Sequence, residues 1–214
     1  MSSNVFGTPI TDDYIKGLPG APNDITAAVR AQYAMDYIND GSKNVDAQTY
    51  VDNLKSQYGN GITCRVVFYN ATGGTLSYVT DHDYHGHIGA APYPLKLQNG
   101  QWGAFLHVHP TGAMVGSSAA AVYGGVNGSG EGRDWMMAWS IPYIGSNHSY
   151  TEIRESGHFA DANDVWGVIS DKMGNSGHET EDSWGGCKSK AIIGESTSPA
   201  YTAMFTLEDV KFLT

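Results

Sequence analysis

The sequence predicts a mainly β protein, an antiparallel β-sandwich of about nine or ten strands with an N-terminal helical hairpin. The 27 glycines and 8 prolines of the 214 residues are spread along the whole chain, which is typical of short strands joined by tight turns. After residue 61, short apolar stretches follow one another without the alternating helices of a parallel sheet. Several of these stretches alternate with a period of two, the period of a strand.

The first 61 residues are expected to form an arm followed by the helical hairpin. Residues 1–23 contain three prolines and little periodicity, which favours an extended arm. Helices are expected at 25–39, capped by Asn23 or Asp24, and at 46–58. We expect this hairpin to pack as a lid on one sheet of the sandwich, which spans residues 62–214 and belongs to the same structural unit.

Strands are expected at regular intervals through the rest of the chain. The sequence Thr72-Gly73-Gly74 predicts a hairpin turn between the first two of them. Residues 81–98 and 171–186 are interpreted as loops, the second of them polar and glycine-containing. The expected strands span residues 63–70, 75–80, 102–109, 116–123, 135–141, 150–154, 165–170, 187–193 and 201–207.

The stretch from residue 99 to residue 142 is the centre of the predicted β-part. In its first strand, alternation places His107 and His109 on one face, about 6.5–7 Å apart along the chain. Its middle strand, 116–123, consists almost entirely of small residues, which suits a strand against which large side chains pack. Ser117 and Ser118 follow Gly116 without the G-x-S-x-G turn of a nucleophilic serine, so acyl transfer is not predicted.

Charge excludes some partners. A net charge of −10 with only 12 lysines and arginines argues against nucleic acid and against binding anionic lipid through charge alone. We also expect no secretory signal, because no basic segment precedes an apolar run, and no transmembrane segment, because no apolar run reaches about 18 residues. Cys64 and Cys187 are expected to stay reduced.

Several segments resemble the plant 23-kDa jasmonate-induced protein family. They are VFGTPI (5–10), QYGNG (57–61), YNATGGTL (69–76), NGQWGAFLHV (99–108), GSSAAAVY (116–123), RDWMMAWSIP (133–142) and CKSKAIIGESTSPAYTA (187–203). The resemblance implies a stress-induced plant defence protein in the cytoplasm, with the nucleus as a second location, and brings no catalytic mechanism with it. The β-part is more distantly similar to the aegerolysins, β-sandwiches that recognise membrane lipids.

Histidines suggest a metal site. His85 and His87 repeat the H-x-H spacing of His107 and His109, and imidazole is a common ligand of Zn, Cu and Fe. The four side chains would converge if their strands were neighbours. A zinc ion there would activate water for hydrolysis or hydration, whereas copper or iron would indicate oxidation.

Aromatic residues suggest a binding site instead. Trp184 lies between Ser183 and Gly185 in a polar segment, and Tyr84 and Tyr93 lie in the segment expected as a loop. Exposed aromatic rings of this kind can stack on sugars or line a lipid-headgroup pocket.

The sequence therefore predicts a jasmonate- or stress-induced protein that binds a small molecule, a glycan or a lipid headgroup. A metal-dependent enzyme that uses the histidine cluster is the alternative, and a stress-storage protein without a specific ligand is the third. Whether the chain is an enzyme, which transition metal it would take and its oligomeric state are left open by the residues alone.

Overall fold

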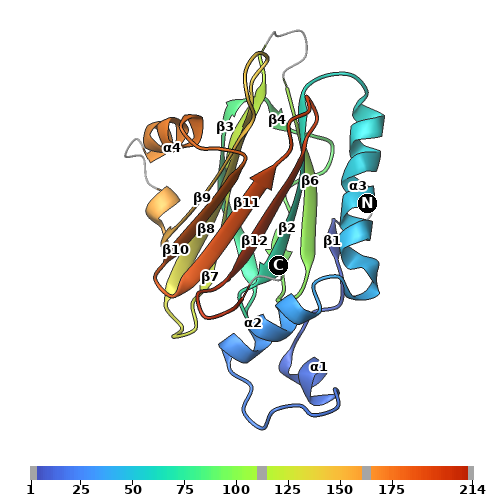
Figure 1. The fold of residues 1–214 in the computed structure, drawn as a ribbon, viewed down its shortest axis with the longest axis vertical. Coiled ribbons are helices and arrows are strands. Elements are labelled where there is room, and N and C mark those ends of the chain that lie inside the picture. Colours follow the sequence, from blue (N-terminus) through green and yellow to red (C-terminus); the bar gives the residue numbers. More distant parts are fainter. Residues whose placement is uncertain (1–3, 110–114, 161–164, 212–214) are drawn as a thin grey trace.

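The computed structural model describes residues 4–109, 115–160 and 165–211, and shows two β-sheets packed face to face (Figure 1). The seven-stranded sheet has the order β1-β6-β2-β12-β11-β10, with β4 paired to β6, and the five-stranded sheet has the order β5-β3-β7-β8-β9. The seven-stranded sheet consists of β1 (Val5–Phe6), β2 (Thr63–Ala71), β4 (His87–Ile88), β6 (Trp102–Val108), β10 (Glu179–Trp184), β11 (Cys187–Ile193) and β12 (Ala200–Leu207). The five-stranded sheet consists of β3 (Leu76–His85), β5 (Lys96–Leu97), β7 (Ser117–Val126), β8 (Gly132–Ile141) and β9 (His148–Glu155).

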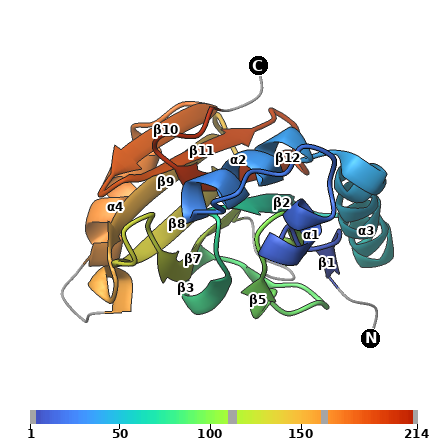
Figure 2. The ribbon, with the colours of Figure 1, turned by 90° about the horizontal axis from the view of Figure 1, so that it is seen from below.

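The predicted class, a mainly β sandwich with N-terminal helices, is confirmed. Strand pairs are antiparallel with one exception among the described residues, the parallel pairing of β12 with β2. This exception follows from chain order, because β12 forms an antiparallel hairpin with β11 and then fills the place beside β2. Figure 2 shows the two sheets edge-on as two layers, with α3 and α4 on opposite sides.

The helices are α1 (Asp12–Lys16), α2 (Ala27–Asp36), α3 (Lys43–Tyr58) and α4 (Val165–Gly174), with short 3-10 turns η1 (Asp40–Ser42) and η2 (His158–Ala160). The predicted hairpin corresponds to α2 and α3, which contact β2 and β6 of the seven-stranded sheet. Helix α2 begins two residues later than predicted, because Thr26 accepts the capping hydrogen bond from the amide of Val29. Helix α1 was not predicted.

Helix α3 begins earlier than predicted, at Lys43. The ammonium group of Lys43 is buried and donates to the carbonyl of Gly100 (2.9 Å) and the hydroxyl of Tyr69 (3.2 Å), which joins α3 to the sheet. Burial lowers the pKa of Lys43 to about 8. A lysine ahead of a predicted helix is ordinarily interpreted as exposed, so sequence gave no signal for this contact.

Three segments differ from their predicted structure. Residues 165–170, expected as a strand, belong to α4, because Ile169 and Met173 pack one helical turn apart on the outer face of the five-stranded sheet. The loop expected at 171–186 contains the end of α4 and the polar edge strand β10. The loop expected at 81–98 contains the end of β3 and the short strands β4 and β5.

The structure also bears on the two cysteines and on membrane-spanning helices. Cys64 and Cys187 are free, in agreement with the expectation that they stay reduced, and the structure shows that both are buried. Among the helices of the described residues, none is both long and apolar enough to cross a membrane.

The prediction of a hairpin turn at Thr72-Gly73-Gly74 is wrong, because the strands that this turn joins, β2 and β3, belong to different sheets. The helices meet the sandwich at this connection between the sheets. Gly73 has φ +77°, and a Cβ at this position would overlap the carbonyl oxygen of Ala27 in α2. The carbonyl of Gly73 accepts from Arg30 (2.6 Å), and its amide donates to Asn99 (2.9 Å). Glycine is therefore required both for the backbone conformation and for the close approach of α2.

We expect Gly73→Ala to lower the free energy of unfolding by about 2–4 kcal/mol, because it adds steric overlap to left-handed strain. Gly20→Ala is the matched control, since Gly20 has φ +74° and no atom of the described residues lies within 4 Å of the added Cβ. Gly20→Ala should lower the free energy of unfolding only by the cost of the left-handed backbone strain, about 1 kcal/mol. Urea unfolding of both variants measures the difference, and equal losses would contradict the close approach.

Candidate ligand-binding site

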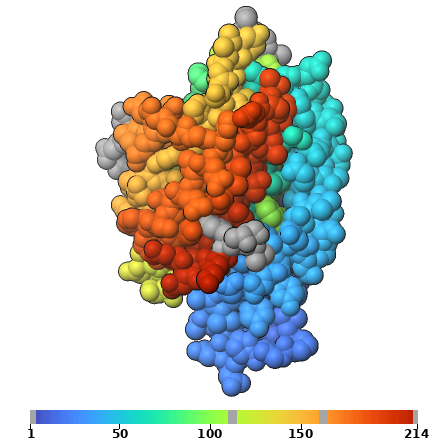
Figure 3. Space-filling view, viewed as in Figure 1, coloured from blue at the N-terminus to red at the C-terminus, as the bar shows by residue number. Residues whose placement is uncertain are grey.

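The loop between β8 and β9 is an exposed apolar tip. Ile144 is 87% exposed and Tyr143 is 52% exposed, and no charged residue occurs between Ser140 and Ser149. The hairpin of β8 and β9 ends at one end of the long axis of the molecule, opposite α1 and α2 (Figure 1). It forms a projection at the upper end in the space-filling view (Figure 3). Contiguous exposed apolar side chains in an uncharged loop are unusual on a protein surface and indicate a contact site.

A cavity of about 430 Å³ adjoins this tip. We call the cavity and the tip together the apical site, which is lined by His85, Val115, Gly116, Ser118, Ser140, Ile141, Pro142, Tyr143 and Ile144.

The polar side chains of the apical site come from three neighbouring strands. Ser118 of β7 is opposite Ser140 of β8 and also opposite His85 of β3 in the strand register. Within the described part of the chain, these three side chains have no hydrogen-bond partner. At the end of the cavity, the backbone of Gly116 is so close to the carbonyl of Ile141 that a Cβ would overlap it. The cavity thus combines free hydrogen-bonding groups with an apolar rim.

A buried histidine lies beside the apical site and links the two sheets. His107 of β6 is fully buried, with Nδ1 2.7 Å from the Ser117 hydroxyl and Nε2 3.0 Å from an Asp83 carboxylate oxygen. Its ring makes a T-shaped contact with Trp139 at a centroid distance of 5.3 Å. Although this set contains serine, histidine and aspartate, Ser117 is completely buried, so a substrate cannot reach its hydroxyl. The arrangement therefore satisfies a buried imidazole rather than activating a nucleophile.

Burial favours the neutral form of the His107 imidazole. Desolvation lowers the pKa of His107 below its ordinary value of 6.5, and the opposing attraction of Asp83 only partly compensates. Asp81 also favours the charged form, whereas His87 disfavours it.

The four histidines predicted as metal ligands are only partly brought together. The condition stated for their convergence is met in part, because β4, which contains His87, pairs with the end of β6. The prediction that His107 and His109 share a face is wrong, because β6 ends at Val108. His109 packs against Tyr58 of α3 (6.1 Å), whereas His107 points between the sheets.

Residues 4–109, 115–160 and 165–211 contain no group of three or more His, Cys, Asp and Glu side chains arranged to hold a metal ion. A Zn, Cu or Fe site at the histidine cluster therefore has no geometric support in the part of the chain that is described.

The predicted aromatic binding residues are placed on different elements. Trp184 at the end of β10 is 37% exposed, but Arg133 and Arg154 lie over its ring at 5.1 and 6.0 Å from the centroid. Tyr84 is half-buried under α4 and donates to the Trp166 carbonyl (2.8 Å). Tyr93 is only 7% exposed, so its predicted exposure is wrong. Its ring stacks on Tyr78 in the core, and the prolines on either side of it, Pro92 and Pro94, gave no sign of this burial.

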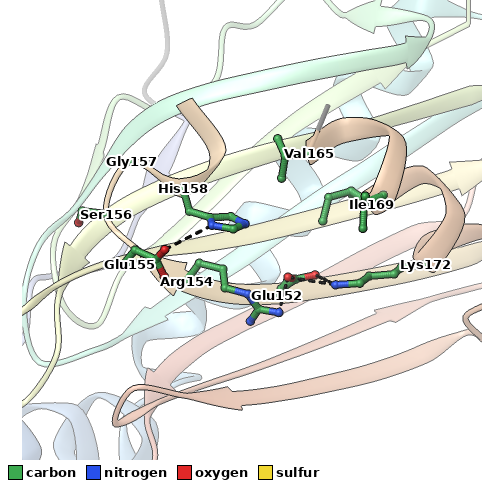
Figure 4. Close-up of a pocket in the computed structure, with 10 residues that line it drawn as sticks. Glu152, Arg154, Glu155, Ser156, Gly157, His158, Val165, Ile169 and Lys172 are labelled. Carbon is green, nitrogen blue, oxygen red and sulfur yellow. Dashed lines mark hydrogen bonds and ion pairs between the residues drawn. The ribbon is translucent and has the colours of Figure 1, made fainter. Parts of the chain in front are cut away.

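A second cavity of about 620 Å³ lies between β9 and α4 (Figure 4). Glu152 is nearly buried there and is paired with Arg154, with Lys172 (3.0 Å) and with the hydroxyl of Tyr150 (2.5 Å). His158 faces Val165 and Ile169 across the cavity in Figure 4 and lies 3.5 Å from Glu155. The charged groups of this cavity are thus engaged with one another, and the pair of Glu152 with Lys172 braces α4 against β9.

Solved structures place this sandwich in a known class. A crystal structure described as the lipid binding protein Nakanori matches with a TM-score of 0.83 and 26% identity, covering 94% of this chain and 98% of that chain. The fold is therefore that of the Nakanori β-sandwich.

Sequence comparison gives the family. A family model described as "Nakanori-like protein" matches residues 6–208, and the chain belongs to this family. It is 48% identical over 199 residues to the 23 kDa jasmonate-induced protein of Hordeum vulgare, covering 92% of this chain and 95% of the relative. A jasmonate-induced protein homolog of Atriplex canescens is 32% identical over 73 residues, covering 34% of this chain and 38% of that protein. The resemblance predicted from sequence is confirmed.

Glu152→Gln should lower the free energy of unfolding by about 1–3 kcal/mol, because the neutral amide leaves Arg154 and Lys172 without their shared carboxylate. Glu155→Gln on the same strand is the control, since the side chain of Glu155 is 61% exposed and its loss should leave stability unchanged. Urea unfolding at neutral pH measures both. A Glu152 variant as stable as the control would show that the paired charges do not brace α4.

Acidification should destabilise the fold through His107. Because its pKa is lower in the folded state, the unfolded chain takes up the proton first, and stability falls as pH drops below about 6.5. Above that pH the contribution is fully present. His107→Gln keeps a hydrogen-bonding side chain but does not titrate, so its free energy of unfolding should fall less over the same pH range. Parallel slopes for the two proteins would contradict the buried neutral imidazole.

Proposed function

We propose that this chain is a stress-induced lipid-binding protein that attaches to zwitterionic membrane surfaces through the apical site. The observation that carries the proposal is the uncharged tip, in which Tyr143 and Ile144 are exposed beside a cavity with free hydrogen-bonding groups.

The side chains of the apical site suit the depth profile of a bilayer surface. Transfer of the Ile144 side chain from water to the acyl boundary is favourable. Tyr143 has the amphipathic ring that is typical of the headgroup level. His85, Ser118 and Ser140 can hydrogen-bond to the phosphodiester oxygens of one headgroup in the adjoining cavity. A net charge of −10 opposes attraction to anionic lipid, so the proposal specifies zwitterionic headgroups.

The comparisons support this function. The structure of Nakanori, described as a lipid binding protein, shares the fold over nearly the whole chain. The barley relative, described as jasmonate-induced, supports the stress context. A role in plant defence and a cytoplasmic location stay predictions.

The double variant Tyr143→Ser/Ile144→Ser should bind phosphatidylcholine vesicles at least about tenfold more weakly, because it removes the apolar area that the membrane would bury. Vesicle co-sedimentation at physiological salt measures the effect. Leu95→Ser is the matched control, since Leu95 is 72% exposed but lies in the loop before β5 and not at the apical site.

The lipid composition separates the outcomes. Phosphatidylcholine vesicles should bind the native chain at least as well as vesicles that also contain phosphatidylserine. Equal losses in the two variants, or binding only to the anionic vesicles, would overturn the proposed surface.

A further inference from the structure

A third cavity, of about 600 Å³, lies between α3 and the outer face of the seven-stranded sheet. Asn44 and Gln48 are four residues apart on α3 and therefore lie on the same side of that helix, and Thr49 adjoins them. Asn39 precedes the helix, and Thr202 of β12 lines the sheet side of the cavity. The polar part of the lining thus consists of amides and hydroxyls.

The polar side chains of this cavity are available for a ligand. Among the residues that the structure describes, the side chains of Asn39, Asn44, Thr49 and Thr202 have no hydrogen-bond partner. Gln48 uses its amino group to donate to Asp52 (2.8 Å), which leaves its carbonyl oxygen free to accept. By contrast, the charged groups of the cavity under α4 already pair with one another.

The apolar part of the lining includes an aromatic residue. Trp102 lies against the cavity with Ile38 and Val67, all of them less than one-tenth exposed. The indole N–H donates to the carbonyl of Ile38 (3.0 Å), and the ring packs on Tyr69 (4.9 Å). Both contacts hold the indole in place, so this side of the cavity is rigid.

The chemistry of the lining selects a class of ligand. Of the residues that the structure describes, no lysine, arginine, aspartate, glutamate or histidine lines the cavity, so a charged ligand would lose hydration without gaining a partner there. Amides and hydroxyls both donate and accept, as the adjacent hydroxyl groups of a sugar require. The C–H face of a sugar ring can pack against the apolar side, and the volume lies in the usual range of small-molecule sites, about 300–1,000 Å³.

We propose that this cavity is a binding site for a neutral sugar, separate from the apical site. The ligand lies between α3 and β12, with its hydroxyl groups on Asn44, Gln48 and Thr202 and its apolar face toward Trp102. A charged sugar, an acyl chain or a phosphate does not fit this set of side chains.

Titration of the isotopically labelled full chain with sugars tests the proposal. The probes are glucose, galactose, mannose, xylose, arabinose, cellobiose and lactose, with glucuronate and glucosamine as the charged counterparts. Because Trp102 lines the cavity and its indole N–H is hydrogen-bonded to Ile38, another lining residue, the NMR signal of this N–H should shift saturably with at least one neutral sugar. Affinity on the order of millimolar is expected for a single sugar unit.

Variants locate the site. Asn44→Ala/Gln48→Ala should weaken binding about tenfold, since two hydrogen bonds are lost. Thr202→Val tests the sheet side of the cavity independently and should weaken binding severalfold. Gln57→Ala is the matched control, because Gln57 is an exposed glutamine of the same helix that does not line the cavity.

The outcomes are distinct from those of the membrane test. The cavity variants should keep their binding to phosphatidylcholine vesicles, and Tyr143→Ser/Ile144→Ser should keep its sugar binding. No saturable shift with any neutral sugar, tighter binding of the charged sugars, or equal affinity in the cavity variants and the control would overturn the proposal.

Discussion

The packing of Phe68 between the two sheets is the contact on which the rest of the sandwich depends. Its ring, from β2, lies 4.7 Å from the ring of Tyr123 in β7, and it also contacts Phe105 and Phe205 of the neighbouring strands. Gly103 makes this possible, because a Cβ there would overlap the Phe68 ring. Since aromatic rings fill the space between the sheets, ligands are confined to the strand ends and to the outer faces. Both proposed sites lie in such places.

The sequence predicted the sandwich because its main signal, alternation with a period of two, is carried by individual strands. Residues 165–170 were assigned wrongly because a short apolar run does not distinguish a buried strand from one face of a helix. Only the contact of Ile169 with the outer face of the five-stranded sheet decides this. Edge strand β10 alternates between exposed and half-buried residues, so it carries no apolar signal, and its structure comes from pairing with β11.

The candidate sites were predicted less well, because they depend on what lies beside each residue in space. The histidine spacing left open whether His85 and His87 lie near the end of β6, and the pairing of β4 with β6 brings them there. The spacing could not show that the strand ends at Val108, which turns His109 toward α3. The apical tip did have a signal in the uncharged run that contains Tyr143 and Ile144. The cavity beside α3 had none, because its amides on one segment meet Trp102 and Thr202 from distant parts of the chain.

The most direct test of the membrane account is the environment of position 144 on a vesicle. Cys64 and Cys187 are fully buried, so a polarity-sensitive fluorophore on Ile144→Cys labels the tip alone. With phosphatidylcholine vesicles, its emission should shift to the blue, while the same label on Val168→Cys, an exposed position of α4, should stay in water. An unchanged emission at position 144, or an equal shift at both positions, would contradict attachment through the apical site.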